Sequence, residues 1–297
     1  MQTQLMSPNM ASQTTEQIQE FIQKSLSKAY RIALVTSGGT TVPLERNTVR
    51  FLDNFSTGKR GASLAENIVN SGRYAVIFLH RIGSRMPWVH SLSFLSQTSI
   101  LDNISLSSSS VSLNVGTNEI ATLKRLLDQY EKGRDRILYI GFTTVHEYLN
   151  LFEQSCRFLS QTGPASCIIS AAAVSDFILD AEDIAEHKIQ SSSSSLTLVL
   201  KPCRKVLGFV KESWSPKSFL VSFKLETDEN ILIDKALLAI KRYHSDAVIG
   251  NLLHERHSRV LIITPGHTET ITTDTIELDL ANEIIALHTV FIEQINK

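Results

Sequence analysis

The sequence predicts an α/β fold: a doubly wound, mostly parallel Rossmann-like sheet with helices on both faces, plus a small antiparallel flap and hairpin. Short apolar segments rich in β-branched residues alternate with longer segments whose apolar residues recur at helical spacing. The first candidate strand runs directly into a glycine turn and a helix start, an order typical of doubly wound proteins. The 297 residues, 42% of them hydrophobic and 20% charged, are enough for a large core.

The first part of the chain is predicted to form a peripheral helix and then a strand–helix–strand unit. Residues 15–28 carry a narrow apolar stripe that suits a helix on the sheet edge. Residues 31–36 have the apolar, β-branched composition of a buried strand, and residues 62–69 show helical spacing up to Gly72, which can end a helix. Residues 74–79 form the next strand, so a parallel pair with a right-handed crossover is expected.

The middle of the chain continues this alternation after an insertion. Residues 91–118 are expected to be an insertion whose serine-rich stretch, Ser105–Ser112, is a low-complexity loop. Helical spacing then resumes at 119–132 and again at 144–159. The apolar run 137–142 between these two helices is predicted to be a strand.

A flap is predicted after the fourth strand, which the apolar run 165–170 indicates. Residues 186–201 contain a second serine run, 191–195, followed by leucines that alternate with polar residues over 196–200. This pattern favours a hairpin or flap with a flexible tip.

The C-terminal part repeats the strand–helix pattern and adds a hairpin around the turn Pro265-Gly266. The predicted elements are a helix at 206–212, a strand at 219–223, a helix at 230–243, a strand at 246–251, hairpin strands at 259–264 and 269–273, and a helix at 280–295.

Composition and charge argue against several classes of function. A net charge of −1 offers no basic surface for nucleic acid. No apolar run reaches the length of a membrane span, and the polar N-terminus lacks a signal-peptide core. The three cysteines lack C-x-x-C spacing and fit a reducing compartment, so a cytoplasmic protein is expected. We expect residues 1–30 to form a tail and helix, and residues 31–297 a single domain.

Two glycine-bearing loops after the first strand form the main candidate site. Ser37–Thr40 contains two adjacent glycines, which let the backbone turn sharply and leave amide N–H groups uncovered. The second loop, 50–61, carries Gly58 and Gly61 into a helix N-terminus, which suits a phosphate. The spacing matches neither a Walker A loop nor the G-x-G-x-x-G fingerprint. A nucleotide or phosphate site is one interpretation, and a tight connection without a ligand is the other.

Four further polar residues have more than one interpretation. Asp176 follows a run of small residues that leave room for a ligand, but a lone Asp there is also a common cap. Lys188, at the base of the flap, is placed to reach a phosphate, and a solvated lysine is the alternative. His254 and His257 lack the i, i+4 spacing of a helical zinc pair, so we assign no metal ligand.

Six blocks of residues match, in the same order, those of one enzyme family. The blocks are Ser37–Thr40, Val42–Glu45, Val49–Ser56 with Gly58 and Gly61, Ala171–Asp176, Glu186–Ser191 and Ser222–Asp228. On these blocks the chain resembles the eukaryotic phosphopantothenoylcysteine synthetases, also called phosphopantothenate–cysteine ligases. The resemblance runs from about residue 31 to the C-terminus, apart from the serine-rich insertions.

The resemblance implies a ligase of coenzyme A biosynthesis that joins 4′-phosphopantothenate to L-cysteine. In this family a nucleoside triphosphate converts the carboxylate to an acyl-nucleotidyl anhydride and releases pyrophosphate; cysteine then displaces the nucleoside monophosphate. Holding two anions together requires positive charge, amide donors and Mg²⁺. Eukaryotic-type motifs favour ATP as the co-substrate, through an acyl-adenylate and AMP, and CTP is the alternative.

The resemblance also assigns roles to individual residues. The nucleotide-binding positions are Gly38, Ser56, Gly58 and Gly61 at the phosphates, with Phe223 and Asn251 at the base and ribose. Asn54 matches the asparagine that holds the carboxyl region of phosphopantothenate and stabilises the acyl intermediate. Ala172, Ala173 and Asp176 match the pantothenate-binding segment. Arg50 matches an arginine that reaches substrate phosphate in the neighbouring subunit, which implies a homodimer. Lys188 matches a flap lysine near the phosphates and joins Asn54 as a candidate catalytic residue.

The chain departs from the family at three places. Lys59-Arg60 stands where some members have two arginines, which keeps the positive charge. Five serines, 191–195, replace a glycine-bearing flap tip. Bacterial relatives carry a flavin-dependent decarboxylase domain before the ligase, and because 30 residues cannot hold one, neither decarboxylase activity nor flavin is expected. A non-catalytic nucleotide-binding protein on the same scaffold is the alternative function.

Overall fold

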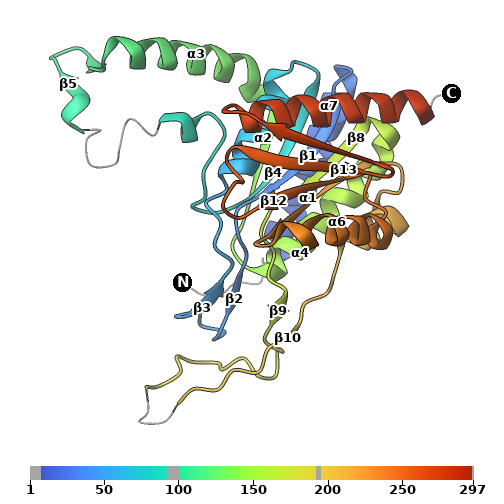
Figure 1. The fold of residues 1–297 in the computed structure, drawn as a ribbon. Coiled ribbons are helices and arrows are strands. Elements are labelled where there is room, and N and C mark those ends of the chain that lie inside the picture. Colours follow the sequence, from blue (N-terminus) through green and yellow to red (C-terminus); the bar gives the residue numbers. More distant parts are fainter. Residues whose placement is uncertain (1–7, 93–100, 192–194, 296–297) are drawn as a thin grey trace.

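A central eight-stranded sheet organises the protein. The computed structural model describes residues 8–92, 101–191 and 195–295 (Figure 1). The strand order is β14-β13-β12-β11-β8-β1-β4-β7, parallel from β12 to β7 and antiparallel at β13 and β14. The strands are β1 (Arg31–Ser37), β4 (Tyr74–Arg81), β7 (Ile137–Phe142), β8 (Ser166–Ser170), β11 (Phe219–Glu226), β12 (Ala247–Leu252), β13 (Arg259–Thr264) and β14 (His267–Thr272). The predicted mostly parallel sheet and its edge hairpin are confirmed.

Helices cover both faces of this sheet. They are α1 (Pro8–Ser27), α2 (Lys59–Asn70), α3 (Thr117–Gly133), α4 (Val145–Leu159), α5 (Leu207–Phe209) with a π-helical turn at Val210–Trp214, α6 (Glu229–Tyr243) and α7 (Ile276–Ile295). Side chains of α2 and α7 form one core with Ala33 and Val35 of β1, and side chains of α1 and α4 form another with Ile32 and Leu34. Because β1 is buried on both faces, its residues 32–35 form a continuous apolar run.

The start of α4 helps to hold the chain that leaves β1. The Thr144 hydroxyl accepts the N–H of Glu147 at 3.2 Å, and the Glu147 carboxylate accepts the N–H of Thr144 at 2.9 Å, which is a capping box. The same turn presents the carbonyl of Thr143 to Thr41, whose N–H lies 3.1 Å from it. The helix cap therefore fixes the first residue of β2.

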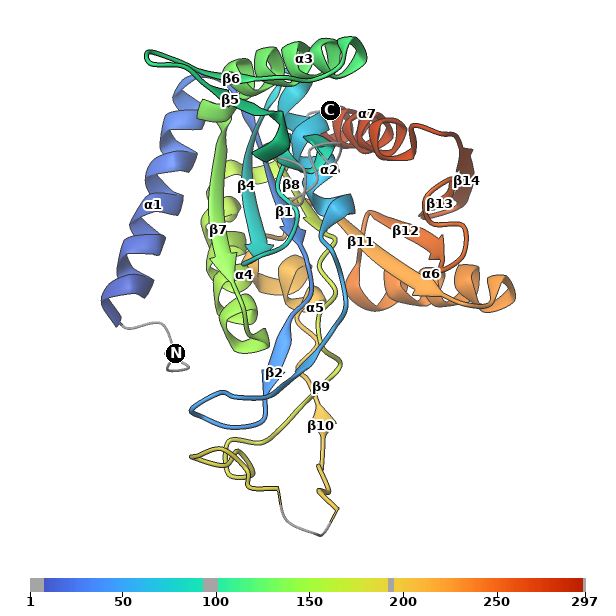
Figure 2. The ribbon, with the colours of Figure 1, turned by 90° about the vertical axis from the view of Figure 1, so that its left-hand side faces the viewer.

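Two narrow arms project from one end of the sheet (Figure 2). The first is the antiparallel pair β2 (Thr41–Pro43) and β3 (Phe51–Asp53), and the second is β9 (Phe177–Ile178) paired with β10 (Lys201–Pro202). The sequence does not predict β2 or β3, because strands of three residues carry no periodic signal. The arms contact each other, since the N–H of Arg46 donates to the carbonyl of Ala185 at 2.8 Å.

Two predicted features differ from the structure. The flap expected over 186–201 has no strand at residues 196–200. Residues 185–186 form hydrogen bonds with residues 46–47 of the first arm instead, so the alternating leucines have no partner strand. The segment expected to be the loop Ser105–Ser112 forms most of a hairpin of β5 (Ile104–Leu106) and β6 (Val111–Leu113). A hydrogen bond from the N–H of Ser107 to the carbonyl of Ser110 closes this hairpin.

Other details of the prediction shift by a few residues. The first helix begins at Pro8 rather than at residue 15, and the last begins at Ile276 rather than at 280. Residues 192–194 of the second serine run lie outside the described residues. Among the described helices, none is both long enough and apolar enough to cross a membrane.

Candidate functional site

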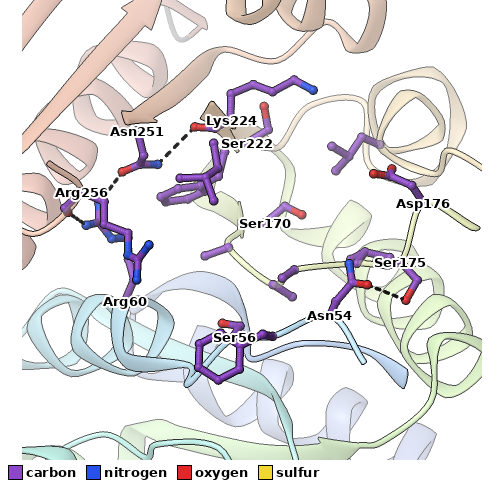
Figure 3. A pocket seen from close by; sticks show the side chains of 18 of the residues that line it. Asn54, Ser56, Arg60, Ser170, Ser175, Asp176, Ser222, Lys224, Asn251 and Arg256 are labelled. Atoms are coloured by element: carbon purple, nitrogen blue, oxygen red, sulfur yellow. Dashed lines mark hydrogen bonds between the residues drawn. The ribbon is translucent and has the colours of Figure 1, made fainter. Parts of the chain in front are cut away.

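The segments that follow β3, β8 and β12, together with residues 222–225 of β11 and Asn251 of β12, surround a cavity of about 670 Å³ (Figure 3). Its walls include residues 54–57, 170–176 and 222–225. It lies beside β1 and β8, where the strand order reverses: β1 pairs with β4 on one side and with β8 on the other. Open α/β sheets bind ligands at such a point, outside the carboxyl ends of the strands.

The cavity brings together most of the residues that the sequence singles out. The predicted site residues that line it are Asn54, Ser56, Ala172, Ala173, Asp176, Phe223 and Asn251. Gly38, Gly58 and Gly61 are not lining residues, and neither are Arg50 and Lys188, which lie on the two arms. The fold thus collects residues of four separate segments and leaves the glycines and the arm residues outside the wall.

The glycines act on the shape of the site, because they allow three segments to touch. A Cβ at Gly39 would lie 1.7 Å from the carbonyl oxygen of Asn54, so a side chain there would displace the Asn54 segment. A Cβ at Gly61 would lie 2.5 Å from the Ser37 hydroxyl oxygen. Gly39 therefore lets the turn after β1 pack against the backbone of the Asn54 segment, and Gly61 lets the start of α2 pack against Ser37 at the end of β1.

Asn54 projects from this packed region into the cavity (Figure 3). Its N–H donates to the carbonyl of Thr40 at 3.1 Å, and its side-chain oxygen lies 3.3 Å from the hydroxyl oxygen of Ser175. The turns after β1 and β8 are joined as well, because the N–H of Ala173 donates to the carbonyl of Gly38 at 2.8 Å. Asn54 is therefore held by both turns.

A partly buried arginine organises one end of the cavity. Arg60 Nη1 lies 2.9 Å from Oδ1 of Asn251, Nη2 donates to the carbonyl of Arg256, and Glu277 of α7 lies 3.9 Å away. Burial lowers the pKa of the Arg60 guanidinium, and the nearby Glu277 carboxylate opposes that shift. Because Oδ1 of Asn251 accepts from Arg60, Arg60 fixes the orientation of the Asn251 amide.

Basic residues that the sequence does not single out also line the cavity. Lys205 forms an ion pair with Asp176, so the predicted Asp176 carboxylate is paired with a lysine ammonium group at the cavity wall. The other unpredicted lining residues that carry charge are Arg204, Lys224, Arg256 and Glu277. The one sequence signal for these bases is that Arg204 and Lys205 are adjacent, shortly after the flap. Together they make the cavity suitable for anionic ligands.

On the arms, Arg50 is engaged by a fully buried carboxylate. Glu45 Oε1 accepts from Arg50 Nη1 at 2.9 Å, and Oε2 accepts the N–H groups of Val49 at 3.1 Å and Arg50 at 2.9 Å. The N–H of Ile189 also points to Oε1, at 3.4 Å, so the same carboxylate holds the residue next to Lys188. Lys188 itself is exposed.

The acidic residues of the cavity wall fit a metal ion that is held mainly by a phosphate ligand. Asp176 and Glu277 are the acidic lining residues in the described part of the chain, and each faces a basic side chain. No cluster of three or more His, Cys, Asp or Glu residues occurs within 8–92, 101–191 and 195–295. Mg²⁺ is commonly held by substrate phosphates and water with one or two carboxylates, which requires no such cluster.

Comparison with known proteins identifies relatives over most of the chain. The family described as DNA/pantothenate metabolism flavoprotein C-terminal domain matches residues 29–90 and 142–287. Phosphopantothenate–cysteine ligase 2 of Oryza sativa subsp. japonica is 38% identical over 272 residues, which span 90% of this chain and 83% of the rice protein. The phosphopantothenate–cysteine ligase of Homo sapiens is 38% identical over 262 residues, 86% of this chain and 83% of the human protein.

A solved structure shares the fold over nearly the whole chain. A Cab2 mutant in complex with phosphopantothenate-cysteine superposes with a TM-score of 0.87 at 36% sequence identity. The match covers 98% of this chain and 97% of that one.

Proposed function

Because the chain belongs to the phosphopantothenate–cysteine ligase family, we propose that it joins 4′-phosphopantothenate to L-cysteine in coenzyme A biosynthesis. The observation that carries the proposal is the cavity in which Asn54, the 170–176 loop and the basic residues around Arg60 come together. The likeness to a Cab2 structure that holds phosphopantothenate-cysteine supports the same substrates.

The reaction requires a leaving group on a carboxylate. The phosphopantothenate carboxylate attacks the α-phosphorus of ATP, pyrophosphate leaves, and an acyl-adenylate forms. The amine of cysteine then attacks the acyl carbon, loses a proton, and expels AMP as the amide bond forms. In this scheme Asn54 donates a hydrogen bond to the acyl oxygen as negative charge develops on it, and a preorganised donor of this kind contributes about 10²- to 10³-fold in rate.

The nucleotide is proposed to occupy the end of the cavity at Arg60, Phe223 and Asn251, and phosphopantothenate the end at Asp176. The start of α2 at Lys59, where the N-cap residue Gly58 provides no side-chain cap, suits the triphosphate. Mg²⁺ would be held chiefly by the phosphates and would offset their charge in the first step. Gly38, Gly58 and Gly61 would shape this end by close packing.

The arms are proposed to complete the site. Arg50 would reach the phosphate of substrate in a second copy of the chain, as in a homodimer, and Lys188 would approach the nucleotide phosphates when the flap closes. Residues 31–297 would act as a single ligase domain. Cys156, Cys167 and Cys203 are buried and unpaired, which fits the reducing conditions of the cytoplasm.

A ligation assay with either triphosphate tests the proposal. Purified protein with phosphopantothenate, cysteine and ATP is expected to release pyrophosphate and AMP and to form phosphopantothenoylcysteine. We expect a higher kcat/KM with ATP than with CTP, and little reaction with pantothenate that lacks the phosphate. Nucleotide binding without any ligation, or pyrophosphate release that does not depend on phosphopantothenate, would instead indicate a non-catalytic nucleotide-binding protein or a hydrolase.

A further inference from the structure

We infer that Ser175 is a positioning residue for Asn54: with Thr40 behind it, Ser175 orients the Asn54 amide so that both N–H groups face the cavity. This inference deepens the proposed function and rests on it. The three side chains come from the turn after β1, the residue after β3 and the turn after β8. Asn54 and Ser175 line the cavity (Figure 3), and Thr40 contacts Ser175 from behind.

Thr40 sets the direction of the hydrogen bonds that reach Asn54 through Ser175. The hydroxyl oxygen of Thr40 accepts the N–H of Ser175 at 2.9 Å. Its own hydrogen must therefore go to another acceptor, and the hydroxyl oxygen of Ser175 lies 3.0 Å away. Both side chains are buried, where an unpaired hydroxyl is costly. Thr40 therefore donates to Ser175.

Ser175 then passes a hydrogen on to Asn54. Its hydroxyl oxygen accepts from Thr40, and its own hydrogen is directed to Oδ1 of Asn54 at 3.3 Å. The carbonyl of Thr40 is the other acceptor within reach, at 3.5 Å, which is the longer contact. An amide whose oxygen accepts from Ser175 must turn its –NH₂ group the opposite way. In Figure 3 the nitrogen of Asn54 indeed lies on the side away from Ser175.

Backbone contacts fix the same three residues. The N–H of Asn54 donates to the carbonyl of Thr40 at 3.1 Å, and the N–H of Thr40 donates to the carbonyl of Ala173 at 3.1 Å. Thr40 thus holds both the main chain and, through Ser175, the side chain of Asn54. Because the backbone of Asn54 cannot shift independently of this turn, the remaining freedom is rotation of the amide, which Ser175 restricts.

This restriction matters because the two ends of an amide have opposite effects on a reacting carboxylate. The –NH₂ end stabilises negative charge on an acyl oxygen, whereas the carbonyl end repels it. A donor that is already oriented requires no reorganisation during the reaction. Loss of Ser175 leaves the amide free to rotate, so kcat is expected to fall about 10-fold while KM for ATP changes little.

A double-mutant cycle tests the inference. We expect Ser175→Ala to lower the kcat of ligation about 10-fold when Asn54 is present, and less than about 2-fold in the Asn54→Ala background, because Ser175 acts through Asn54. Ser175→Thr, which keeps the hydroxyl, should restore most of the rate. Thr40→Val should lower kcat in the same Asn54-dependent way. Ser155→Ala is the matched control, since this buried serine of α4 has no hydrogen-bond partner among the described residues.

The outcomes separate this inference from the proposed function. Equal loss in both backgrounds, with wild-type ligation intact, would overturn the role of Ser175 and leave the ligase proposal standing. Full activity of Asn54→Ala would also overturn it. Absence of wild-type ligation would reject the proposed function first, and the inference with it. If Ser175→Ala does not fold, the nearly isosteric Ser175→Cys, a much weaker donor, replaces it in the cycle.

Discussion

Glu45 holds Arg50 through a fully buried carboxylate, with Oε1 of Glu45 2.9 Å from Nη1 of Arg50. Burial by itself raises the pKa of Glu45, but the N–H groups of Arg50, Val49 and Ile189 lower it overall. The charge is thus stabilised by donors from both arms. Any change at this position is expected to affect the arms together.

The first prediction concerns this carboxylate. Glu45→Gln removes the charge and turns an amide donor towards N–H groups, so we expect a loss of about 2 kcal/mol in the free energy of unfolding. Trypsin should also cleave after Lys188 faster than in the wild type. Glu186→Gln is the control, because its ion pair with Arg46 is exposed and should contribute less than about 0.5 kcal/mol. Equal proteolysis of the two variants would contradict the prediction.

The second prediction concerns the donor end of Asn54. Asn54→Asp keeps an oxygen acceptor for Ser175 but removes the –NH₂ group and adds a charge, so we expect kcat to fall at least 100-fold. ATP binding, measured by calorimetry, should change less than about 3-fold. Ligation at the wild-type rate would show that no donor is needed at this position.

The third prediction concerns Arg60. Arg60→Lys keeps the charge, but a single ammonium cannot contact both the Asn251 side chain and the Arg256 carbonyl. We expect KM for ATP to rise about 10-fold and KM for phosphopantothenate to change less than 2-fold. Arg259→Lys, whose partners Glu229 and Glu255 are not lining residues of the cavity, should leave both constants unchanged. A parallel rise in both constants would argue against a role at the nucleotide end.

The fourth prediction concerns close packing at Gly61. Gly61→Ala places a Cβ 2.5 Å from Ser37, so the start of α2 must shift, and we expect a loss of about 1–3 kcal/mol in the free energy of unfolding. Gly208→Ala is the matched control, because its Cβ would meet neighbours only at 3.6 Å or more. The denaturant-unfolding midpoints of the two variants test this prediction, and equal midpoints would contradict it.

The fifth prediction concerns pH. Burial lowers the pKa of His288 to about 4, and the ring lies between the Tyr74 hydroxyl at 2.8 Å and the carbonyl of Pro164 at 2.9 Å. An unfolded His has a pKa of about 6.5, so between these values the unfolded state binds more protons. Stability contributed by neutral His288 is present above about pH 6.5 and falls by about 3 kcal/mol as the pH drops to about 4. Urea unfolding at several pH values should show this decline, and His288→Gln should flatten it.

The main sheet and helices are predictable because burial leaves a mark on the local sequence. β1 is covered on both faces, so its residues 32–35 are all apolar, while the alternation of strand and helix implies parallel order. β2 and β3 leave no such mark. These three-residue strands form because the Thr143 carbonyl holds Thr41 and because the Glu45 carboxylate organises the turn between the strands. The first contact joins distant parts of the chain, and the second depends on a buried charge.

Part of the site is also predictable, because some of its residues lie in loops that the local sequence marks. Asp176 follows a small-residue turn, and Asn54 lies in the loop that carries Gly58 and Gly61. The rule for open sheets places such loops at the carboxyl ends of strands. The contact between Arg60 and Asn251 joins residues 191 positions apart, and nothing near either residue signals the other. The paired Lys205 and the Ser175 hydroxyl are equally invisible, because a polar side chain near a turn has many possible partners.

The placement of β1 in the middle of the sheet has a consequence for synthesis of the protein. One edge of β1 pairs with β4 as soon as residues 74–80 are made, but its other edge pairs with residues 166–170 of β8. While the ribosome adds the intervening segment, the nascent chain therefore carries an apolar strand with an unsatisfied edge, the kind of edge that recruits other strands. Chaperone occupancy of ribosome-bound chains should consequently be highest before residue 170 emerges and should drop once β8 is available.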